Sequence, residues 1–327
     1  MAKLAEIEWR VFTDVDDLGK ILSSWTIEST QIEGGVVCDF RPQIAFPDLI
    51  VARYMVSRRR IENFQVPTDM TCFGFVLTNR EPPLLCGIKI PNSVLVIVPS
   101  VRDYLLVAPT GYDSFEILIS NELIVEMELL PERFLQDRSL SKRFFLPLAN
   151  PDATRFRNWL SRTFSDQSQL LTFASDPFAA SQFRDCFLHE FGLLLTQGLN
   201  GSGLNAERVS HRYGLIRRTL DVMHGKLTEP TTIQEMANEL SVRPRLLQSA
   251  FADVLEISPY QYFTQRRLHA IRRELLEQTG HTITVTSAAM RYGFNDLGRF
   301  SRRYCELFGE LPSETLRSGT KSSRCSL

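Results

Sequence analysis

The sequence has no run of apolar residues long enough to cross a membrane as a helix. The densest stretch, SVLVIVPSV at 93–101, contains Pro99, whereas a spanning helix needs roughly 18 to 20 consecutive apolar residues. The opening segment MAKLAEIEWR places charges where a secretory signal requires an apolar core. We therefore expect a cytoplasmic protein with no membrane partner.

The sequence also lacks the signatures of common catalytic and metal sites. Its six cysteines, at 38, 72, 86, 186, 305 and 325, show no CxxC spacing and no pairing with histidine. Nucleophile elbows, phosphate-cradling loops and dinucleotide fingerprints are absent. We predict no metal, no cofactor and no catalytic residues. Buried reduced thiols are the favoured interpretation of the cysteines, with a redox sensor as the alternative.

Charge of either sign is nearly balanced over the whole chain but not along it. The net charge of the 327 residues is -1, and 43% of them are apolar, which is enough for a full core and typical of two domains. Residues 206–327 contain 18 Lys and Arg against 13 Asp and Glu, so their net charge is +5, and the net charge of residues 1–205 is -6. This asymmetry favours a C-terminal part that faces nucleic acid.

The N-terminal part reads as strands followed by helices. From about residue 36 to 125, the runs LIVARYMV, CFGFVL, SVLVIV, YLLVA and FEILI alternate with turn residues, which predicts an antiparallel sandwich or barrel. Helical spacing follows over about 131–199. There, Phe183, Phe187, Phe191 and Leu195 form one stripe. This stripe packs against the strands or forms a dimer helix with a second copy, and we keep the four residues as dimer candidates.

The C-terminal part repeats itself. The residues Ile233, Met236, Ala237 and Leu240 recur 52 positions later as Val285, Ala288, Ala289 and Tyr292. After one extra turn residue, Leu247, Phe251, Leu255 and Pro259 recur 53 positions later as Phe300, Tyr304, Phe308 and Pro312. Each copy has helical spacing, a short break and helical spacing again. This pattern predicts two helix-turn-helix units, at about 233–254 and 285–308.

Local signals support the boundaries of these helices. Thr232 and Glu235 have the spacing of a capping box. Pro244 suits a first helical turn, Asp296 suits an N-cap, and Gly293 suits a tight turn. Between the copies, residues 259–276 read as one long helix that holds the two units at a fixed separation. Its apolar face is formed by Leu268, Ile271 and Leu275, flanked by Arg266, Arg267, Arg272 and Arg273.

On these residues, the segment 218–319 resembles the DNA-binding domain of AraC/XylS-type transcriptional regulators. The resemblance rests on the double repeat, on RRL at 266–268, and on RYGFNDLGRFSRRY at 291–304 continuing to LFGELPSE. The sequence departs from the family pattern at Ala288, Arg243 and Ser249, which bears on the contacts of the first unit rather than on the fold.

The resemblance implies an order of domains. Residues 1–200 would form a cupin-like domain for ligand binding and dimerisation, followed by a linker and helix start at 201–217, the DNA-binding domain at 218–319 and a tail at 320–327. The fold class is then α+β, a cupin-like barrel or sandwich with helices, followed by an all-α domain. Metal-dependent cupin enzymes need clustered histidines on their strands. The five histidines, at 189, 211, 224, 269 and 281, all lie outside the strand region.

In a helix-turn-helix, the N-terminal half of the second helix meets base edges in the major groove. The base-contact candidates are Arg245, Gln248 and Ser249 in the first unit and Gly298, Ser301 and Arg302 in the second. The phosphate-contact candidates are Arg243, Arg291, Arg299 and Arg303. A solvated helix face is the alternative for any one of these arginines, and it is disfavoured for the set.

For an effector pocket, the candidates are Arg53, Tyr54, Arg102 and Tyr104, with surface charge as the alternative. The whole pattern predicts a transcriptional activator that binds promoter DNA, contacts RNA polymerase, forms a homodimer and responds to a small molecule. A constitutive or protein-gated regulator, an enzyme with an appended DNA-binding module, and a protein-interaction scaffold remain alternatives.

Overall fold

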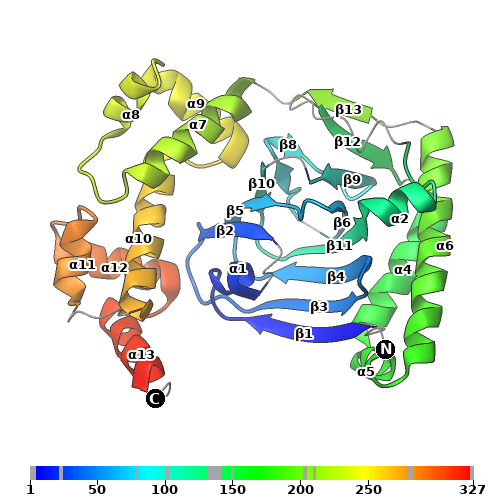
Figure 1. The fold of residues 1–327 in the computed structure, drawn as a ribbon. Coiled ribbons are helices and arrows are strands. Elements are labelled where there is room, and N and C mark those ends of the chain that lie inside the picture. The colour runs from blue at the N-terminus through cyan, green and yellow to red at the C-terminus, as the bar shows by residue number, and fades with distance from the viewer. Residues whose placement is uncertain are drawn as a thin grey trace. The chain divides into compact units, whose positions relative to one another are not determined.

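The computed structural model describes residues 5–21, 25–78, 80–100, 103–131, 142–148, 151–201, 205–208, 211–277 and 283–324. The chain divides into two compact units (Figure 1). The first comprises Met1–Ser29, Cys38–Ser57 and Glu62–Val209, and the second comprises Thr30–Val37, Arg58–Ile61 and Ser210–Leu327. None of the helices in the described ranges combines the length and apolar character needed to span a membrane.

Strands dominate the first unit and form two sheets. The larger has the order β1 (Glu6–Phe12), β3 (Asp39–Ala45), β4 (Leu49–Val56), β11 (Tyr112–Ser120), β6 (Met70–Thr78), β9 (Val94–Pro99), β12 (Lys142–Pro147) and β13 (Asn205–Arg208). The smaller has the order β2 (Thr26–Gln31), β5 (Arg60–Gln65), β10 (Asp103–Ala108), β7 (Leu84–Leu85) and β8 (Ile88–Lys89). Both are open along their described strands, so the α+β fold class is confirmed in its sandwich form, not as a closed barrel.

Strands β1, β2, β12 and β13 lie outside the region of about 36–125 in which strands were predicted, and β12 lies within the range 131–199 predicted as helical, so both predicted ranges are wrong at these places. The sequence of β1 nevertheless carries a signal. In EIEWRVF, the charged residues Glu6, Glu8 and Arg10 alternate with apolar ones. Such a period of two is typical of a strand, although in β1 the apolar Trp9 and Val11 are the exposed side chains, at 40% and 50%, and Glu8 and Arg10 are half-buried. β1 lies at the edge of the larger sheet and pairs only with β3 among the described strands. Its polar content masked a strand that the alternation could have revealed.

Three helices cover one face of the larger sheet, namely α4 (Pro151–Ser165), α5 (Gln167–Ser175) and α6 (Pro177–Gly201). On β11, Phe115, Ile117 and Ile119 are fully buried in the core beneath these helices. Successive side chains on a strand point to opposite faces, so Tyr112 and Glu116 lie on the other face. Short helices α1 (Asp17–Ile21) and α2 (Asn121–Glu126) complete the unit, the latter capped by Ser120.

The aromatic stripe of α6 belongs to this core. The four side chains of Phe183, Phe187, Phe191 and Leu195 are 0 to 5% exposed. Phe187 stacks on Phe191 with ring centroids 5.5 Å apart, and Phe191 meets Phe73 of β6 edge-on at 5.2 Å. These side chains are therefore unavailable to a second copy, and their assignment as dimer contacts is wrong. The stripe faces the sheet because the sheet offers the larger apolar surface to bury.

The cysteines differ in exposure. Cys72 and Cys86 are buried, Cys305 is half-buried, and Cys38 and Cys186 are exposed, and all five are free thiols. The expectation of buried thiols therefore holds for two of them and is wrong for the two exposed ones. Burial raises the pKa of the Cys72 thiol well above its usual value, which keeps it protonated and unreactive. The sixth cysteine lies outside the described residues.

Helices form most of the second unit. In chain order they are α7 (His211–Gly225), α8 (Ile233–Glu239), α9 (Pro244–Leu255), α10 (Pro259–Glu277), α11 (Val285–Arg291), α12 (Leu297–Phe308) and α13 (Pro312–Arg324). The long helix α10 contributes Leu268, Ile271 and Leu275 to a core shared with α11 and α12. The apolar face predicted for this helix is thus the one that packs against the second repeat.

The second unit also contains a short segment from early in the sequence, Thr30–Val37. The backbone N–H of Gln31 donates to Nε2 of His269 on α10 at 3.0 Å, and Nε2 of Gln265 donates to the carbonyl of Ile32 at 2.9 Å. The N–H of Gly35 donates to the carbonyl of Leu307 on α12 at 3.1 Å. These bonds fix the segment against the two helices, which the sequence pattern did not indicate.

His269 makes the stability of the second unit depend on pH. Burial, and then the nearby charge of Arg266, lowers the pKa of His269 from 6.5 to about 3. Below pH 6.5, the unfolded chain binds a proton that the folded chain refuses. The free energy of unfolding therefore falls as the pH is lowered from 6.5 towards 3, by about 1.4 kcal/mol per pH unit from this group.

We expect His269→Gln to remove that part of the pH dependence, because the glutamine oxygen still accepts from Gln31 but does not titrate. Urea unfolding of both proteins at a series of pH values below 6.5 measures the difference. Parallel stability curves for the two proteins would show that folding does not lower the pKa of His269.

Candidate nucleic-acid interface

The first helix of each repeat begins with a capping box. Oγ1 of Thr232 accepts from the N–H of Glu235 at 3.2 Å, while the Glu235 carboxylate accepts from the N–H of Thr232 at 2.7 Å. In the second copy, Thr284 and Ser287 exchange the same bonds at 3.0 and 3.1 Å. The sequence predicted only the first box, because serine replaces the glutamate that marks the motif.

The turns of the two repeats contain equivalent backbone hydrogen bonds. The N–H of Val242 donates to the carbonyl of Ala237 at 2.9 Å, and 52 positions later the N–H of Phe294 donates to the carbonyl of Ala289 at 3.0 Å. The corner residue has positive φ in both copies, 56° at Ser241 and 82° at Gly293. The internal repeat therefore extends to backbone conformation.

The second helices, α9 and α12, are the predicted reading helices. Proline is the first residue of α9, and Asp296 caps α12 by accepting from the N–H of Arg299 at 2.9 Å. Each helix has one buried face, with Leu247 and Phe251 on α9 and Phe300 and Tyr304 on α12 at most 1% exposed. The opposite face of each helix is consequently presented to solvent.

The base-contact candidates lie on these presented faces. Arg245, Gln248, Gly298 and Arg302 are exposed, and Ser249 and Ser301 are half-buried. In both copies the serine stands one position from a buried residue, which explains its lower exposure. None of the six is turned into the interior, so their positions are compatible with contacts to base edges.

The four phosphate-contact candidates differ in their surroundings. Arg243 and Arg299 are exposed. The Arg303 guanidinium lies 5.9 Å from the ring centroid of Tyr260, and its Nη1 lies 3.4 Å from the Tyr260 hydroxyl. This arginine lowers the pKa of Tyr260. Arg291 forms an ion pair with Glu274, which leaves less of its charge for a phosphate.

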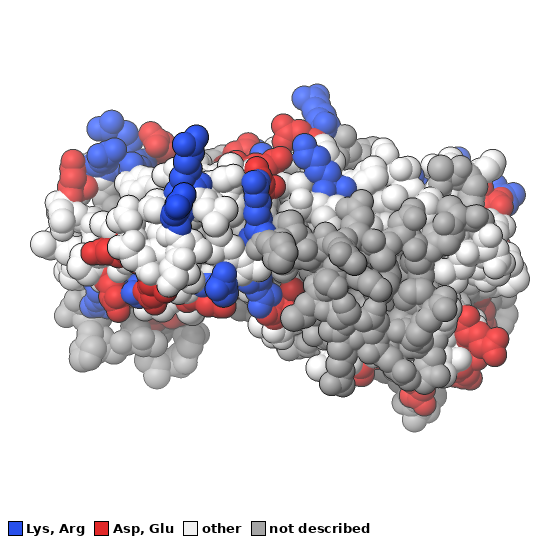
Figure 2. Space-filling view, turned by 90° about the horizontal axis from the view of Figure 1, so that it is seen from above, with Lys and Arg blue, Asp and Glu red and all other residues white. Residues whose placement is uncertain are grey.

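Positive charge concentrates on one of the two reading helices. α12 carries Arg299, Arg302 and Arg303, whereas α9 carries only Arg245 and has Asp253 in an ion pair with Arg212. On the face of the helical unit seen in Figure 2, Lys and Arg side chains are interspersed with Asp and Glu rather than gathered in one continuous patch. The second repeat is therefore the better candidate for the main electrostatic contact with a polyanion.

The arginines of the RRL run have structural roles that the sequence did not separate from DNA binding. Arg266 is 3% exposed, and its Nη1 donates to Oγ1 of Thr30 at 3.2 Å. Arg267 lies 4.1 Å over the ring of Phe263, and its Nε donates to the carbonyl of Leu227 at 2.9 Å. Arg267 thus ties α10 to the loop between α7 and α8, which positions the first repeat.

The residues predicted to line an effector pocket do not lie together in the structure. Tyr54 lines a cavity of about 70 Å³ in the first unit. Its neighbour Arg53 points to the opposite sheet face, where it pairs with Asp113 at 2.7 Å, because adjacent strand residues alternate. Tyr104 is buried and donates to the carbonyl of Pro99 at 2.9 Å without lining the cavity. Arg53 and Tyr104 are therefore wrong as cavity residues, and Arg102 lies outside the described residues.

No cluster of three or more histidine, cysteine or acidic side chains with metal-binding geometry occurs in the described ranges. The candidate side chains on the presented faces of α9 and α12 are arginine, glutamine, serine and glycine, beside the exposed Leu246 and Leu297. Arginine, glutamine and serine recognise base edges and phosphates by hydrogen bonding and charge.

Comparison with known proteins identifies the repeated region. A family model described as a helix-turn-helix domain matches residues 236–318. The chain is 30% identical over 135 residues to the XylDLEGF operon transcriptional activator of Pseudomonas putida, a match covering 41% of this chain and 42% of that protein. It is 28% identical over 165 residues to the probable thc operon regulatory protein of Rhodococcus erythropolis, covering 50% and 49%. These matches span less than half the length of either relative.

Among solved structures, a probable AraC family transcriptional regulator from Rhodopseudomonas palustris CGA009 is 30% identical. The match covers 32% of this chain and 97% of that one, with a TM-score of 0.31.

The corner residues of the two turns yield a paired prediction. A left-handed backbone conformation costs an L-residue roughly 1–2 kcal/mol relative to glycine. At Gly293 an added Cβ meets no heavy atom closer than 3.6 Å, so the cost comes from the backbone alone. We expect Gly293→Ala to lower the free energy of unfolding by about 1–2 kcal/mol, and Ser241→Gly at the equivalent corner to cause no such loss.

Chemical denaturation of both variants measures this pair. Equal destabilisation by the two substitutions would mean that the turns are not conformationally equivalent.

Proposed function

The chain belongs to the AraC/XylS family of regulators, and from this premise we propose that it is a sequence-specific DNA-binding transcriptional activator. The observation that carries the proposal is the pair of helix-turn-helix units with matched turns and outward-facing Arg245, Gln248 and Arg302. The Pseudomonas putida relative is an operon transcriptional activator by name, which supports activation over repression.

Each reading helix has side chains suited to particular bases. Arg302 and Arg245 can pair bidentately with guanine through O6 and N7, and Gln248 with adenine. The arginines Arg243, Arg299 and Arg303 hold phosphates, which sets the register without reading sequence. Arg291 contributes less because Glu274 already pairs with it. Specificity thus comes from both units, and most of the electrostatic affinity from α12.

The spacing of the two units constrains the DNA. α10 has 19 residues and is therefore about 28 Å long at 1.5 Å per residue. Successive major-groove segments on one face of B-DNA are about 34 Å apart. If α10 sets a separation shorter than that distance, both reading helices seat fully only on bent DNA, at a cost that depends on its sequence.

The remaining partners follow from this role. An activator works at promoter DNA together with RNA polymerase, in the cytoplasm where the DNA lies. We propose a homodimer whose interface does not use the buried stripe of α6. We also propose gating by a small molecule in the cavity of the first unit, rather than constitutive or protein-gated action, because a cavity lined by mixed polar and apolar side chains is a binding site in form.

Arg302→Ala tests the base-reading role. We expect an affinity loss of about 5- to 150-fold for the specific site, equivalent to 1–3 kcal/mol, with relaxed preference at one base pair. The site is first defined by footprinting, and binding is then measured by fluorescence anisotropy on that site and on single-base variants of it.

Arg155→Ala is the matched control, because Arg155 is an exposed arginine of α4 in the first unit, and we expect it to leave DNA affinity unchanged. Equal weakening by Arg302→Ala on every sequence would reassign Arg302 to phosphate contact. Affinity that does not fall as the salt concentration rises would contradict DNA binding altogether, since phosphate contacts release counterions.

A further inference from the structure

Strand β1 forms one edge of the larger sheet in the first unit (Figure 1). It pairs with β3 on one side, and no other strand of the described residues lies on its outer side. On one face of β1, the side chains of Trp9 and Val11 are exposed although both are apolar. An edge strand with exposed apolar side chains presents its backbone as a template for a further strand.

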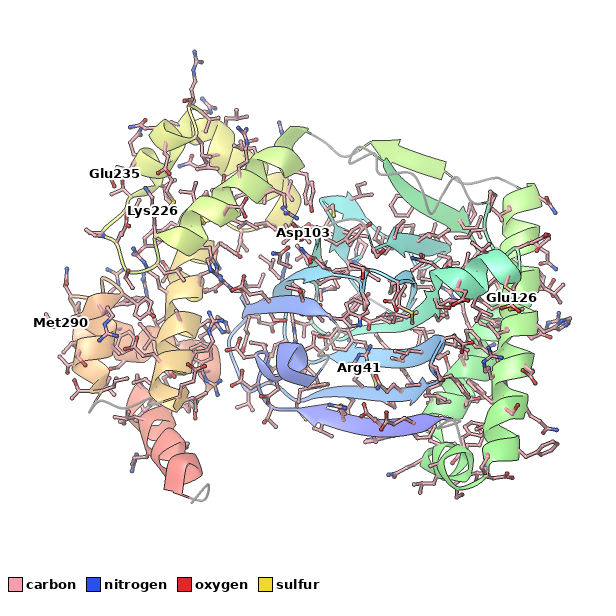
Figure 3. All side chains as sticks on the ribbon, in the orientation of Figure 1. Arg41, Asp103, Glu126, Lys226, Glu235 and Met290 are labelled. Carbon is pink, nitrogen blue, oxygen red and sulfur yellow. The ribbon has the colours of Figure 1, made fainter. Side chains whose placement is uncertain are left out.

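The other face of β1 carries charge of both signs. Nε of Arg10 donates to the Glu8 carboxylate at 2.6 Å, and Nη2 donates to it as well. The amide of Gln43 on β3 donates to the same carboxylate at 2.6 Å. In the strand register, Arg10 lies directly opposite Arg41, labelled in Figure 3, which pairs with Glu116. Arg10 thus shares its carboxylate with Gln43, and its Nη1 can bind a second carboxylate beyond the edge.

Charged side chains on an edge strand usually prevent edge-to-edge pairing. The charges of β1 differ in that Glu8 and Arg10 have opposite signs and stand two positions apart on one face. Two copies of a strand that pair antiparallel about a two-fold axis perpendicular to the sheet keep each side chain on its own face. One residue then lies opposite its own copy, and the residues on either side of it lie opposite each other.

This symmetry selects one register. With Trp9 at the centre, Glu8 of each copy lies opposite Arg10 of the other, Trp9 lies opposite its own copy, and Ile7 lies opposite Val11. A centre at Glu8 or at Arg10 would place two like charges directly opposite each other, which destabilises a strand pair. Among the three central positions of β1, only Trp9 brings opposite charges together without any like pair.

We propose that the chain forms a homodimer in which β1 pairs antiparallel with β1 of a second copy, centred on Trp9. The two larger sheets then become one continuous sheet. The partner is a second copy rather than a different protein, because the strand is complementary to itself in charge and in apolar side chains. This inference rests on the homodimer of the proposed function and assigns its interface.

The contacts across this interface are of kinds that stabilise antiparallel sheets. Opposite charges and aromatic side chains attract when they lie directly across a strand pair. Val11 meets Ile7 of the other copy, a residue that already borders the core beneath the helices. A pair of seven-residue strands is small compared with the roughly 1,200–2,000 Å² buried in a stable complex. We therefore expect reversible association in the micromolar range.

Two charge reversals test the register on the full-length chain. Glu8→Arg gives every copy two positive side chains at the interface, and Arg10→Glu gives every copy two negative ones. We expect each variant alone to dimerise at least about tenfold more weakly, because attraction becomes repulsion at both symmetric pairs. Sedimentation velocity over a concentration series measures the dissociation constant of the dimer.

Mixing the two variants separates the interface from the fold. In the mixture, every cross-strand pair joins a positive to a negative side chain, so we expect heterodimers with an affinity near that of the original homodimer. Both variants lose the bond between Glu8 and Arg10 within the strand, and mixing does not restore it. Fluorescence-detected sedimentation with one variant labelled measures the heterodimer, and thermal melts establish that each variant is folded.

Val11→Lys tests the apolar contact, and we expect it to weaken the dimer. Val125→Lys is the matched control, because Val125 is an exposed valine of α2 in the same unit, and we expect it to leave the dissociation constant unchanged.

The β1 interface is refuted if both charge reversals retain the dimer, if their mixture forms no heterodimer, or if the two lysine substitutions weaken the dimer equally. A dimer that persists in all of these variants leaves the proposed homodimer in place with its interface elsewhere. A monomeric original chain at every concentration refutes the homodimer and the interface together. Footprinting of the same preparation measures DNA binding separately, so the regulatory function stands or falls on its own result.

Discussion

The burial of one face of each reading helix is the constraint on which the proposed DNA interface depends. Leu247 and Phe251 on α9, and Phe300 and Tyr304 on α12, are held in apolar surroundings at almost no exposure. A helix with one face fixed in this way has no rotational freedom about its own axis. The direction of Arg302 and its neighbours therefore follows from hydrophobic packing, and their charge is free to serve recognition.

α10 converts two separate helix pairs into one structure. Its apolar face packs on the second repeat, while Arg267 ties it to the loop that precedes the first repeat. A guanidinium that is even partly removed from water needs hydrogen-bond partners, and the carbonyl of Leu227 is one for the half-buried Arg267. The arginines of the RRL run thus have structural roles, whereas the exposed arginines of α9 and α12 are the ones available for recognition.

In the first unit, the alternation of side chains along a strand separates core residues from cavity residues. On β11, the odd-numbered residues Phe115 and Ile117 enter the dry core beneath the helices, whereas Glu116 faces the cavity. One sheet therefore supplies both the stability of the unit and the polar end of its pocket. The pairing of Arg41 with Glu116 offsets part of the cost of burying them.

The sequence by itself determined the two helix-turn-helix units, because their signals are local. Apolar spacing, Thr232, Pro244, Gly293 and Asp296 act within one or two turns of the chain and need no distant partner. Only the tertiary structure decided that the α6 stripe faces the sheet and that the side chains of Arg53 and Tyr54 point to opposite sheet faces. The same holds for the packing of Thr30–Val37 on α10 and for the pairing of Arg41 with Glu116 in a cavity that Glu62 also lines. Those outcomes depend on which distant surfaces meet, and the free energy of that burial is not encoded in any single segment.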